Sequence, residues 1–170
     1  MPFDLRADVA EIPRSTDTVD FTLKLKLARE VKELRAAEEL DEDLLKAKEA
    51  ELAAATYTAA LASVPRRQRE DIYEESLEKF QAKPSLFRDQ VDELTQFKRN
   101  NFVRIGVVAA AVQSLTKNGE TLDDPAAIYD AIQFLHDEAP DQVFTLLEAK
   151  TLKLNTEEDE QDALHKSADF

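Results

Sequence analysis

The chain of 170 residues contains no cysteine and only two glycines. Without cysteine it can form neither a disulfide nor a thiolate nucleophile, and a zinc site with cysteine ligands is excluded. Two glycines cannot build a glycine-rich phosphate-binding loop. They also disfavour a sheet-rich fold with many tight turns. The composition therefore favours helices and removes several classes of chemistry.

Positive charge is also scarce, because 22 Lys and Arg side chains stand against 36 Asp and Glu side chains and give a formal net charge of -14. Such a surface repels the phosphates of nucleic acid and anionic membrane surfaces. It suits high solubility, or a basic or apolar protein partner. The one concentrated basic patch is Arg66, Arg67 and Arg69, which we expect to pair with the carboxylates at 70–75 or with an acidic partner.

Long apolar runs are rare, and the longest is FVRIGVVAAAVQSL at 102–115. It falls well short of the roughly 20 residues needed to cross a bilayer. Large apolar residues recur in it at helical spacing. They are Phe102, Ile105, Val108, Val112 and Leu115. The run predicts one buried helix with other helices packed around it. Residues 1–15 lack the basic start and apolar centre of a signal peptide, so a cytoplasmic location is expected.

Two segments alternate in the way that half-buried strands do. Val19, Phe21 and Leu23 alternate with polar residues, although this segment could also be the first part of the following helix. The second segment, 56–64, is expected to return and pair with the first. Between them, residues 28–55 have a helical period in an Ala, Glu and Lys background, with Asp41 as a helix start. This region predicts a protruding helical hairpin or one long helix.

Pro65 is expected to begin a helix that ends near residue 80, and Ser85 to cap the next one. The pair Asn100–Asn101 then either separates that helix from the central run or kinks a continuous rod. The inward-facing residues of these helices are predicted to be Ile72, Leu77, Phe80, Phe87, Val91 and Leu94.

The remaining chain contains clear signals for turns and helix starts. Asn118–Gly119 predicts a turn with positive φ angles, and Asp124–Pro125 predicts an N-cap followed by a first-turn proline. Pro140 is expected to start the last helix. The inward-facing residues are predicted to be Ile128, Ile132, Leu135, Val143, Leu147 and Leu154.

The predicted fold is mostly α: a helical domain with a protruding helical hairpin, and a small two-stranded sheet if both strand predictions hold. Residues 1–17 are expected to be a flexible leader and 18–155 the helical domain, with 28–55 as its hairpin arm. After Asn155 the apolar pattern fails, so the acidic segment 156–170 is predicted to be a disordered tail.

The sequence offers few candidates for chemistry. His136 has Asp137 and Glu138 beside it, but residues one and two apart do not share a helix face, so this is no metal constellation. We interpret it as a surface histidine near a helix end, and His165 falls in the predicted tail. The carboxylate-rich runs lack the glycine-bearing calcium-loop pattern. We therefore predict no enzymatic activity, no cofactor and no metal.

The order of segments resembles that of a known family. VDFTLKL leads into a charged helical region, which returns through TYTAALASVPRRQREDIYEE to the central run, and DDPAAIYDAIQFL and DQVFTLLEAKTLKLN close the domain. This arrangement resembles the tail assembly chaperones of long-tailed bacteriophages, in the form common among phages of actinobacteria. The resemblance covers roughly residues 18–155. The chain departs from the family's pattern in two features, a longer and more acidic hairpin and an acidic end.

The resemblance implies a non-enzymatic protein in the cytoplasm of the infected host that coats the helical, aggregation-prone tape measure protein. It also implies delivery of tail tube subunits. Self-association is open, and no nucleic-acid or membrane partner is expected. The alternative is a permanent structural component of a phage particle, such as a neck, connector or capsid-associated subunit. The partner groove is predicted to be lined by Leu34, Leu44, Phe87, Val91, Leu94, Phe134 and Leu147.

Overall fold

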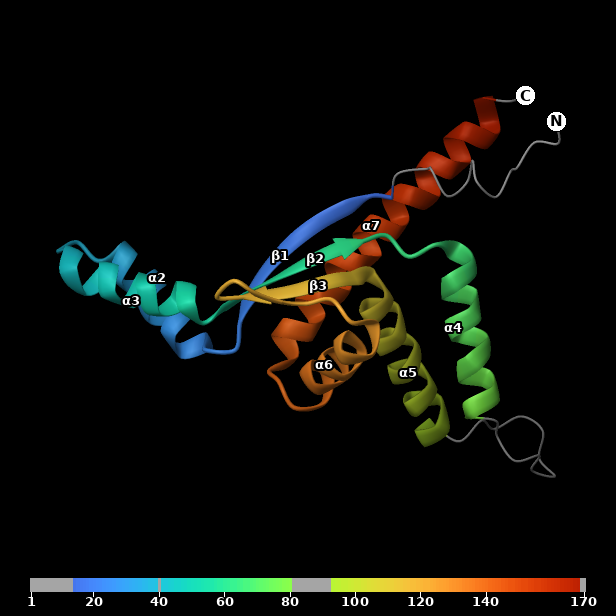
Figure 1. The fold of residues 1–170 in the computed structure, drawn as a ribbon, viewed down its shortest axis with the longest axis horizontal. Helices are drawn as coiled ribbons and strands as arrows, with labels where there is room; N and C mark the ends of the chain where they lie inside the picture. The colour runs from blue at the N-terminus through green and yellow to red at the C-terminus, as the bar shows by residue number, and fades with distance from the viewer. Residues whose placement is uncertain (1–13, 40, 81–92, 169–170) are drawn as a thin grey trace.

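The computed structural model describes residues 14–39, 41–80 and 93–168. These parts are mostly helical and contain one four-stranded antiparallel sheet (Figure 1). In chain order the elements are β1 (Thr16–Thr22), α2 (Leu25–Ala36), α3 (Glu42–Ala54), β2 (Thr56–Ala62), α4 (Arg66–Lys79), α5 (Glu93–Ala111), β3 (Val112–Lys117), β4 (Glu120–Leu122), α6 (Pro125–Asp137) and α7 (Asp141–Ala168).

The sheet has the strand order β1-β2-β3-β4, and both strands predicted from alternation are confirmed. β1 pairs with β2 so that Val19 lies opposite Ala59 and Phe21 opposite Tyr57. The Phe21 and Tyr57 rings stack with centroids 5.2 Å apart. Residues of alternate position are buried, as expected when one face of a sheet covers the core. The sheet is larger than the two strands predicted.

The prediction of one helix through 102–115 is wrong at its end, because α5 stops at Ala111 and the chain continues as β3. The cause is a bulge. Ala60 pairs with Ser114 while Leu61 pairs with Val112, so Gln113 is an extra residue in the ladder. Val112 and Leu115 are three residues apart, yet both are buried. A bulged strand therefore reproduced the spacing of a helix.

The turn predicted at Asn118–Gly119 joins β3 to β4. Asn118 has φ 52° and Gly119 has φ 79°, the pair of positive φ values that a two-residue type I′ hairpin requires. Asn tolerates this region better than most residues, and Gly has no Cβ to clash. The turn prediction is confirmed, but β4 adds a strand that the sequence did not predict.

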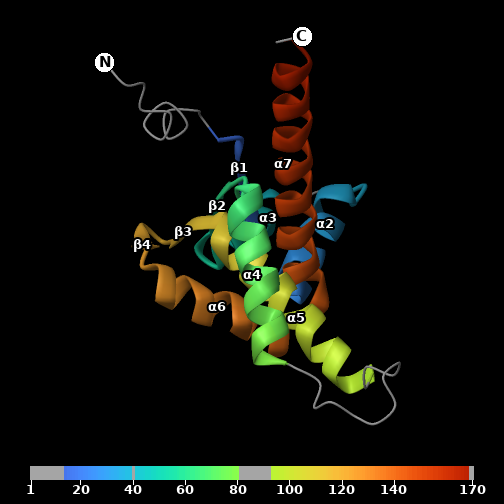
Figure 2. The ribbon, with the colours of Figure 1, turned by 90° about the vertical axis from the view of Figure 1, so that its right-hand side faces the viewer.

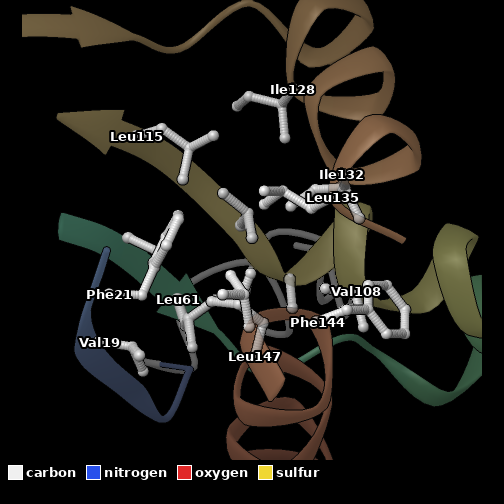
Figure 3. Packing of buried hydrophobic residues seen from close by; sticks show 14 of the residues in the cluster. Val19, Phe21, Leu61, Val108, Leu115, Ile128, Ile132, Leu135, Phe144 and Leu147 are labelled. Carbon is white, nitrogen blue, oxygen red and sulfur yellow. The ribbon is translucent and has the colours of Figure 1, made fainter. Parts of the chain in front are cut away.

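The last two helices close the core, as predicted. The Asp124 carboxylate accepts a hydrogen bond from the Ala127 N–H at 2.9 Å, and Pro125 occupies the first turn of α6. Side chains from the sheet, α5, α6 and α7 converge in one cluster (Figure 3). Its best-buried members include Ala59, Leu61, Val64, Val108, Ile128, Ile132 and Leu147.

Helix α7 continues to Ala168, so the prediction of a disordered tail is wrong for residues 156–168. The apolar stripe does end at Asn155, but ion pairs support the helix beyond that residue. Asp159 lies 2.6 Å from the Arg69 guanidinium of α4, and Lys153 pairs with Glu157 one turn on at 3.7 Å. Figure 2 shows α7 extending past the sheet as one long rod.

Two further boundaries need correction. Residues 16 and 17 of the predicted leader belong to β1, and the Asp17 carboxylate is 3.0 Å from Lys150 Nζ of α7. Helix α5 runs without interruption through Asn100 and Asn101, so these residues do not separate two helices. Residues 1–13 of the leader, and the Ser85 cap, lie outside the described residues.

Helices α2 and α3 follow one another and pack together at one end of the molecule, beyond the ends of the strands (Figure 1). As predicted, Asp41 is the N-cap of α3 and accepts a hydrogen bond from the Leu44 N–H at 3.1 Å. Charged pairs link the two helices, with Arg35 2.7 Å from Glu49 and Lys48 3.1 Å from Glu30.

Helix α4 begins after Pro65, as predicted, but only part of its expected stripe is buried. Ile72 is half-buried, whereas Leu77 is 37% exposed, and the fully buried residue is Ser76. The predicted arginine–carboxylate pairing is present between Arg66 and Glu70, at 2.9 Å. α4 therefore packs against α5 with few large apolar side chains.

The closest of these contacts generates a testable prediction. A Cβ added at Gly106 would lie 2.9 Å from Ile72 Cγ2, which is too close, and β-branched Ile72 cannot easily turn away. We expect Gly106→Ala to lower the free energy of unfolding by about 1 kcal/mol, because overpacking outweighs the gain in helix propensity. In an Ile72→Ala background the same change should be stabilising by about 1 kcal/mol.

Urea unfolding of the four chains of this cycle measures both signs. Gly119→Ala is the matched control, since its Cβ would meet nothing within 4 Å but its φ is positive. It should cost about 1 kcal/mol in both backgrounds. If Gly106→Ala has the same sign with and without Ile72, the proposed steric conflict between α4 and α5 is refuted.

Candidate functional site

Of the seven residues predicted to line a partner groove, the five in the described parts of the chain do not lie on one common surface. Phe87 and Val91 lie outside the described residues. Leu147 is fully buried in the core between α7 and the sheet, so its assignment as a partner contact is wrong. The prediction that Leu147 faces inward is confirmed, and a side chain buried in the core has no surface left to contact a partner.

The other four predicted residues lie on four different helices. Leu34 on α2 is half-buried, Leu44 on α3 is 44% exposed, Leu94 on α5 is 56% exposed and Phe134 on α6 is 55% exposed. α2 and α3 are at one end of the molecule, away from the start of α5 (Figure 1). The sequence identified outward apolar residues here but not a common surface.

The structure instead forms an apolar groove of about 440 Å³ where α4, α5 and the start of α6 meet. We call it the α4–α5 groove. Its apolar lining consists of Ile72, Phe102, Gly106, Ala109, Ala110, Pro125 and Tyr129. None of these residues was predicted as a partner contact. The available signal was the side of the central helix that carries only glycine and alanine.

One wall of the groove is a ridge of α4. Gln68, Ile72, Glu75 and Lys79 follow one another at intervals of four and three residues, so they share one helix face. The floor is α5, where Gly106, Ala109 and Ala110 have small or absent side chains. Such a floor lets the backbone of another helix approach closely.

Aromatic rings mark both ends of the α4–α5 groove. Phe102 lies edge-on to Phe80 with centroids 5.8 Å apart, and Lys79 Nζ sits 4.7 Å from the Phe102 centroid. On the α6 side, burial raises the pKa of the Tyr129 hydroxyl, and the negative charge of Glu75 raises it further. Tyr129 thus lines the groove as a neutral aromatic side chain.

The helices that form the groove also carry large apolar side chains on the surface. Tyr73 on α4 is 52% exposed, and Phe97 on α5 is 61% exposed. The charged residues of α4 are mostly acidic between 70 and 78. The groove is thus apolar at its floor, and its α4 wall carries one carboxylate, Glu75, and one ammonium group, Lys79.

A second cluster ties α5, α6 and α7 together. The Arg104 guanidinium donates two hydrogen bonds to the Glu148 carboxylate, at 2.6 and 2.8 Å, and lies 5.4 Å from the Phe144 ring centroid. His136 packs edge-on against the same ring, and its Nδ1 is 2.7 Å from the Asp137 carboxylate. His136 is half-buried, so its interpretation as a surface residue needs correction.

This cluster is structural in character. The Glu148 carboxylate accepts hydrogen bonds from Nε and Nη2 of the Arg104 guanidinium, and the Phe144 ring lies between Arg104 and His136, which come from three different helices. Across 14–39, 41–80 and 93–168, no group of three or more His, Asp or Glu side chains is placed to hold a metal ion. No helix in the same ranges combines the length and apolar character needed to cross a bilayer.

Comparison of the chain with protein-family models, with curated proteins and with solved structures gave no match in any of the three. The resemblance to tail assembly chaperones therefore stays a prediction, and function has to be argued from the surfaces described above.

The Arg104–Glu148 pair generates a pH prediction. Hydrogen bonding from Arg104 lowers the pKa of Glu148 below its ordinary value, against a smaller opposing effect of burial. A carboxyl whose pKa is lower in the folded state stabilises the fold above its unfolded pKa, and this contribution is lost as pH falls through the folded pKa. We expect Glu148→Gln to cost about 1 kcal/mol at pH 7, and its difference from the native chain to shrink below about pH 4.

Chemical denaturation across this pH range measures the difference directly. Glu160→Gln, on the exposed face of the same helix, removes an equal charge and should change stability little at any pH. A Glu148→Gln deficit that stays constant down to pH 3 would show that the ionised pair is not its cause.

Proposed function

We propose that this chain is a binding protein without catalytic activity, which holds a helical segment of another protein in the α4–α5 groove and keeps that protein soluble. The observation that carries the proposal is the groove itself: an apolar hollow between helices, open at the surface of a chain with a net charge of -14.

The shape of the groove supports a helix as the ligand. An amphipathic helix presents apolar side chains at i, i+3, i+4 and i+7, and binds where two helices flank a narrow apolar floor. α4 and α6 provide the flanks, and Gly106, Ala109 and Ala110 provide the floor. The Phe102 and Tyr129 rings offer large contact areas at either end, as aromatic residues commonly do in interfaces.

The charge of the chain supports a solubilising role. A surface with a large net charge of one sign repels its own copies, so a complex that carries it stays dispersed. Glu75 lines the groove on its α4 side and can pair with a basic residue beside the apolar stripe of a partner helix.

The resemblance described above supplies the specific form of the proposal. The partner is the tape measure protein of a long-tailed phage, with tail tube protein as a further client, and the location is the cytoplasm of the infected host. The adjacent helices α2 and α3 then serve as a protruding helical hairpin that extends the contact with a long partner. Their charged pairs, Arg35–Glu49 and Lys48–Glu30, suit an exposed arm.

The alternative is a permanent structural subunit of a phage particle. It is favoured by the side of the sheet that faces away from the core, where Thr18, Thr58, Ser114 and Thr116 are uncharged and can pack against a neighbouring subunit. Mass spectrometry of purified particles separates the two proposals. Abundant peptides of this chain in finished particles favour the structural subunit, and their absence favours the chaperone.

A groove-filling substitution tests the binding proposal. Co-expression with the tape measure protein should keep that protein in the soluble fraction, and Ala110→Trp should weaken the complex about tenfold or more, because the indole occupies the space of the partner helix. Ala50→Trp, at an exposed position of α3, is the matched control and should leave binding unchanged.

Circular dichroism and thermal melting of both variants establish that they fold. A tape measure protein that precipitates equally with and without the native chain would contradict the proposed function. A soluble complex that Ala110→Trp does not weaken would leave the chaperone role intact but refute the α4–α5 groove as its site.

A further inference from the structure

The four-stranded sheet has two faces of different character. The inner face carries Phe21, Leu61 and Leu115 into the core (Figure 3). The register places the alternate residues of every strand on the opposite side, which we call the outer face. Its central part consists of Thr18, Thr58, Ala60, Ser114, Thr116 and Thr121.

The outer face is nearly free of charge, although 34% of the residues in the chain are charged. Among its residues in the described strands, Asp20 alone carries a charge, and the Thr58 hydroxyl donates a hydrogen bond to it at 2.6 Å. The Thr116 and Thr121 hydroxyls bond to each other at 3.1 Å. An outer face that served only to contact water could carry Lys and Glu freely, so their absence is a feature to explain.

The outer face also carries only small side chains in its central part. No side chain in its central part is larger than threonine, so a second sheet can approach to the roughly 10 Å spacing of packed sheets. At the end next to α3 the face continues into a hollow of about 500 Å³. Thr56, Thr58 and Thr116 form one side of this hollow, and Leu52 and Ala53 form the other. The Arg35–Glu49 pair and Lys117 lie at its rim.

We propose that the outer face binds the outer face of a second copy of this chain, so that two sheets pack face to face in a two-fold dimer. Two copies that each carry a charge of -14 repel one another, and they can approach with least repulsion where charge is missing. A two-fold interface uses the same patch twice, so it needs no complementary partner surface.

The position of Asp20 fits this symmetry. It lies on β1, at one edge of the sheet, and a two-fold axis that runs between the two sheets and parallel to the strands places β1 of one copy over β4 of the other. The two Asp20 carboxylates therefore lie on opposite edges and do not meet. A partner of different chemistry would need charged or large apolar groups to be recognised, and the outer face offers neither.

The size of the outer face sets the strength expected. The strands have 7, 7, 6 and 3 residues, and at about 3.3 Å per residue and about 4.8 Å between strands they cover roughly 360 Å² per copy. Two copies would bury roughly 700 Å² in total, below the roughly 1,200–2,000 Å² of stable interfaces, so the dimer should be weak and transient, with a dissociation constant of about 100 μM or higher. Added salt should strengthen it, because salt screens the repulsion between like-charged copies.

Light scattering coupled to size exclusion, on the full chain from about 1 μM to about 500 μM, tests the proposal. We expect a monomer that becomes a dimer as concentration rises, with the transition shifted to lower concentration at about 1 M salt. Thr116→Arg, in the centre of the outer face, should raise the dissociation constant at least tenfold. Thr145→Arg, on the exposed side of α7, makes the same change in charge and should have no effect.

Ala60→Arg provides a second variant on β2 in case Thr116→Arg does not fold, and melting curves show which variants are native. An added Arg changes the net charge from -14 to -13 and so weakens the repulsion between whole chains. A loss of dimer therefore cannot arise from added repulsion. A monomer at every concentration and salt overturns the proposal. So does a dimer that neither Thr116→Arg nor Ala60→Arg weakens.

Discussion

The packing of the inner face of the sheet against α5, α6 and α7 is the constraint on which the rest of the structure depends. Leu61 from the sheet, Ile132 from α6 and Leu147 from α7 each have at most 1% of their surface exposed. Burial of such side chains contributes roughly 1.5–3 kcal/mol each. Because these helices pack on one side, the opposite side of the sheet is left as a surface, and α4 is left outside the main cluster.

The position of α4 explains why a groove exists. Its sequence between 66 and 79 is mostly charged, and its contacts with α5 include Ile72 against Gly106 and Lys79 over the Phe102 ring. A helix with so few apolar side chains cannot cover the whole exposed side of α5. The alanines of α5 therefore remain accessible beside it. An ion pair to α7 and a hydrogen bond from Arg69 to the Val64 carbonyl, at 3.0 Å, hold α4 at this distance.

The elements with strong local signals could be predicted from the sequence. Asp41 and Asp124 cap helices, Asn118–Gly119 forms the turn, and Val19 and Phe21 alternate into the core, because each of these depends on neighbouring residues alone. The boundary between α5 and β3 could not be predicted, since the bulge at Gln113 gives Val112 and Leu115 the spacing of a helix face. The helical structure of residues 156–168 could not be predicted either, since it depends partly on the hydrogen bond from Arg69 to Asp159, two residues that are 90 positions apart in the sequence.

The candidate site was harder to predict than the fold, for a related reason. Apolar periodicity identifies side chains that leave water, but it does not distinguish a face buried within the chain, such as that of Leu147, from a face that binds another chain. The α4–α5 groove arises where periodicity is weakest, at Gly106, Ala109 and Ala110, whose small side chains give little hydrophobic signal. The same holds for the threonines of the outer face. In a chain this acidic, surfaces able to meet another protein are better identified by missing charge than by abundant hydrophobicity, because each carboxylate at an interface must be desolvated or paired.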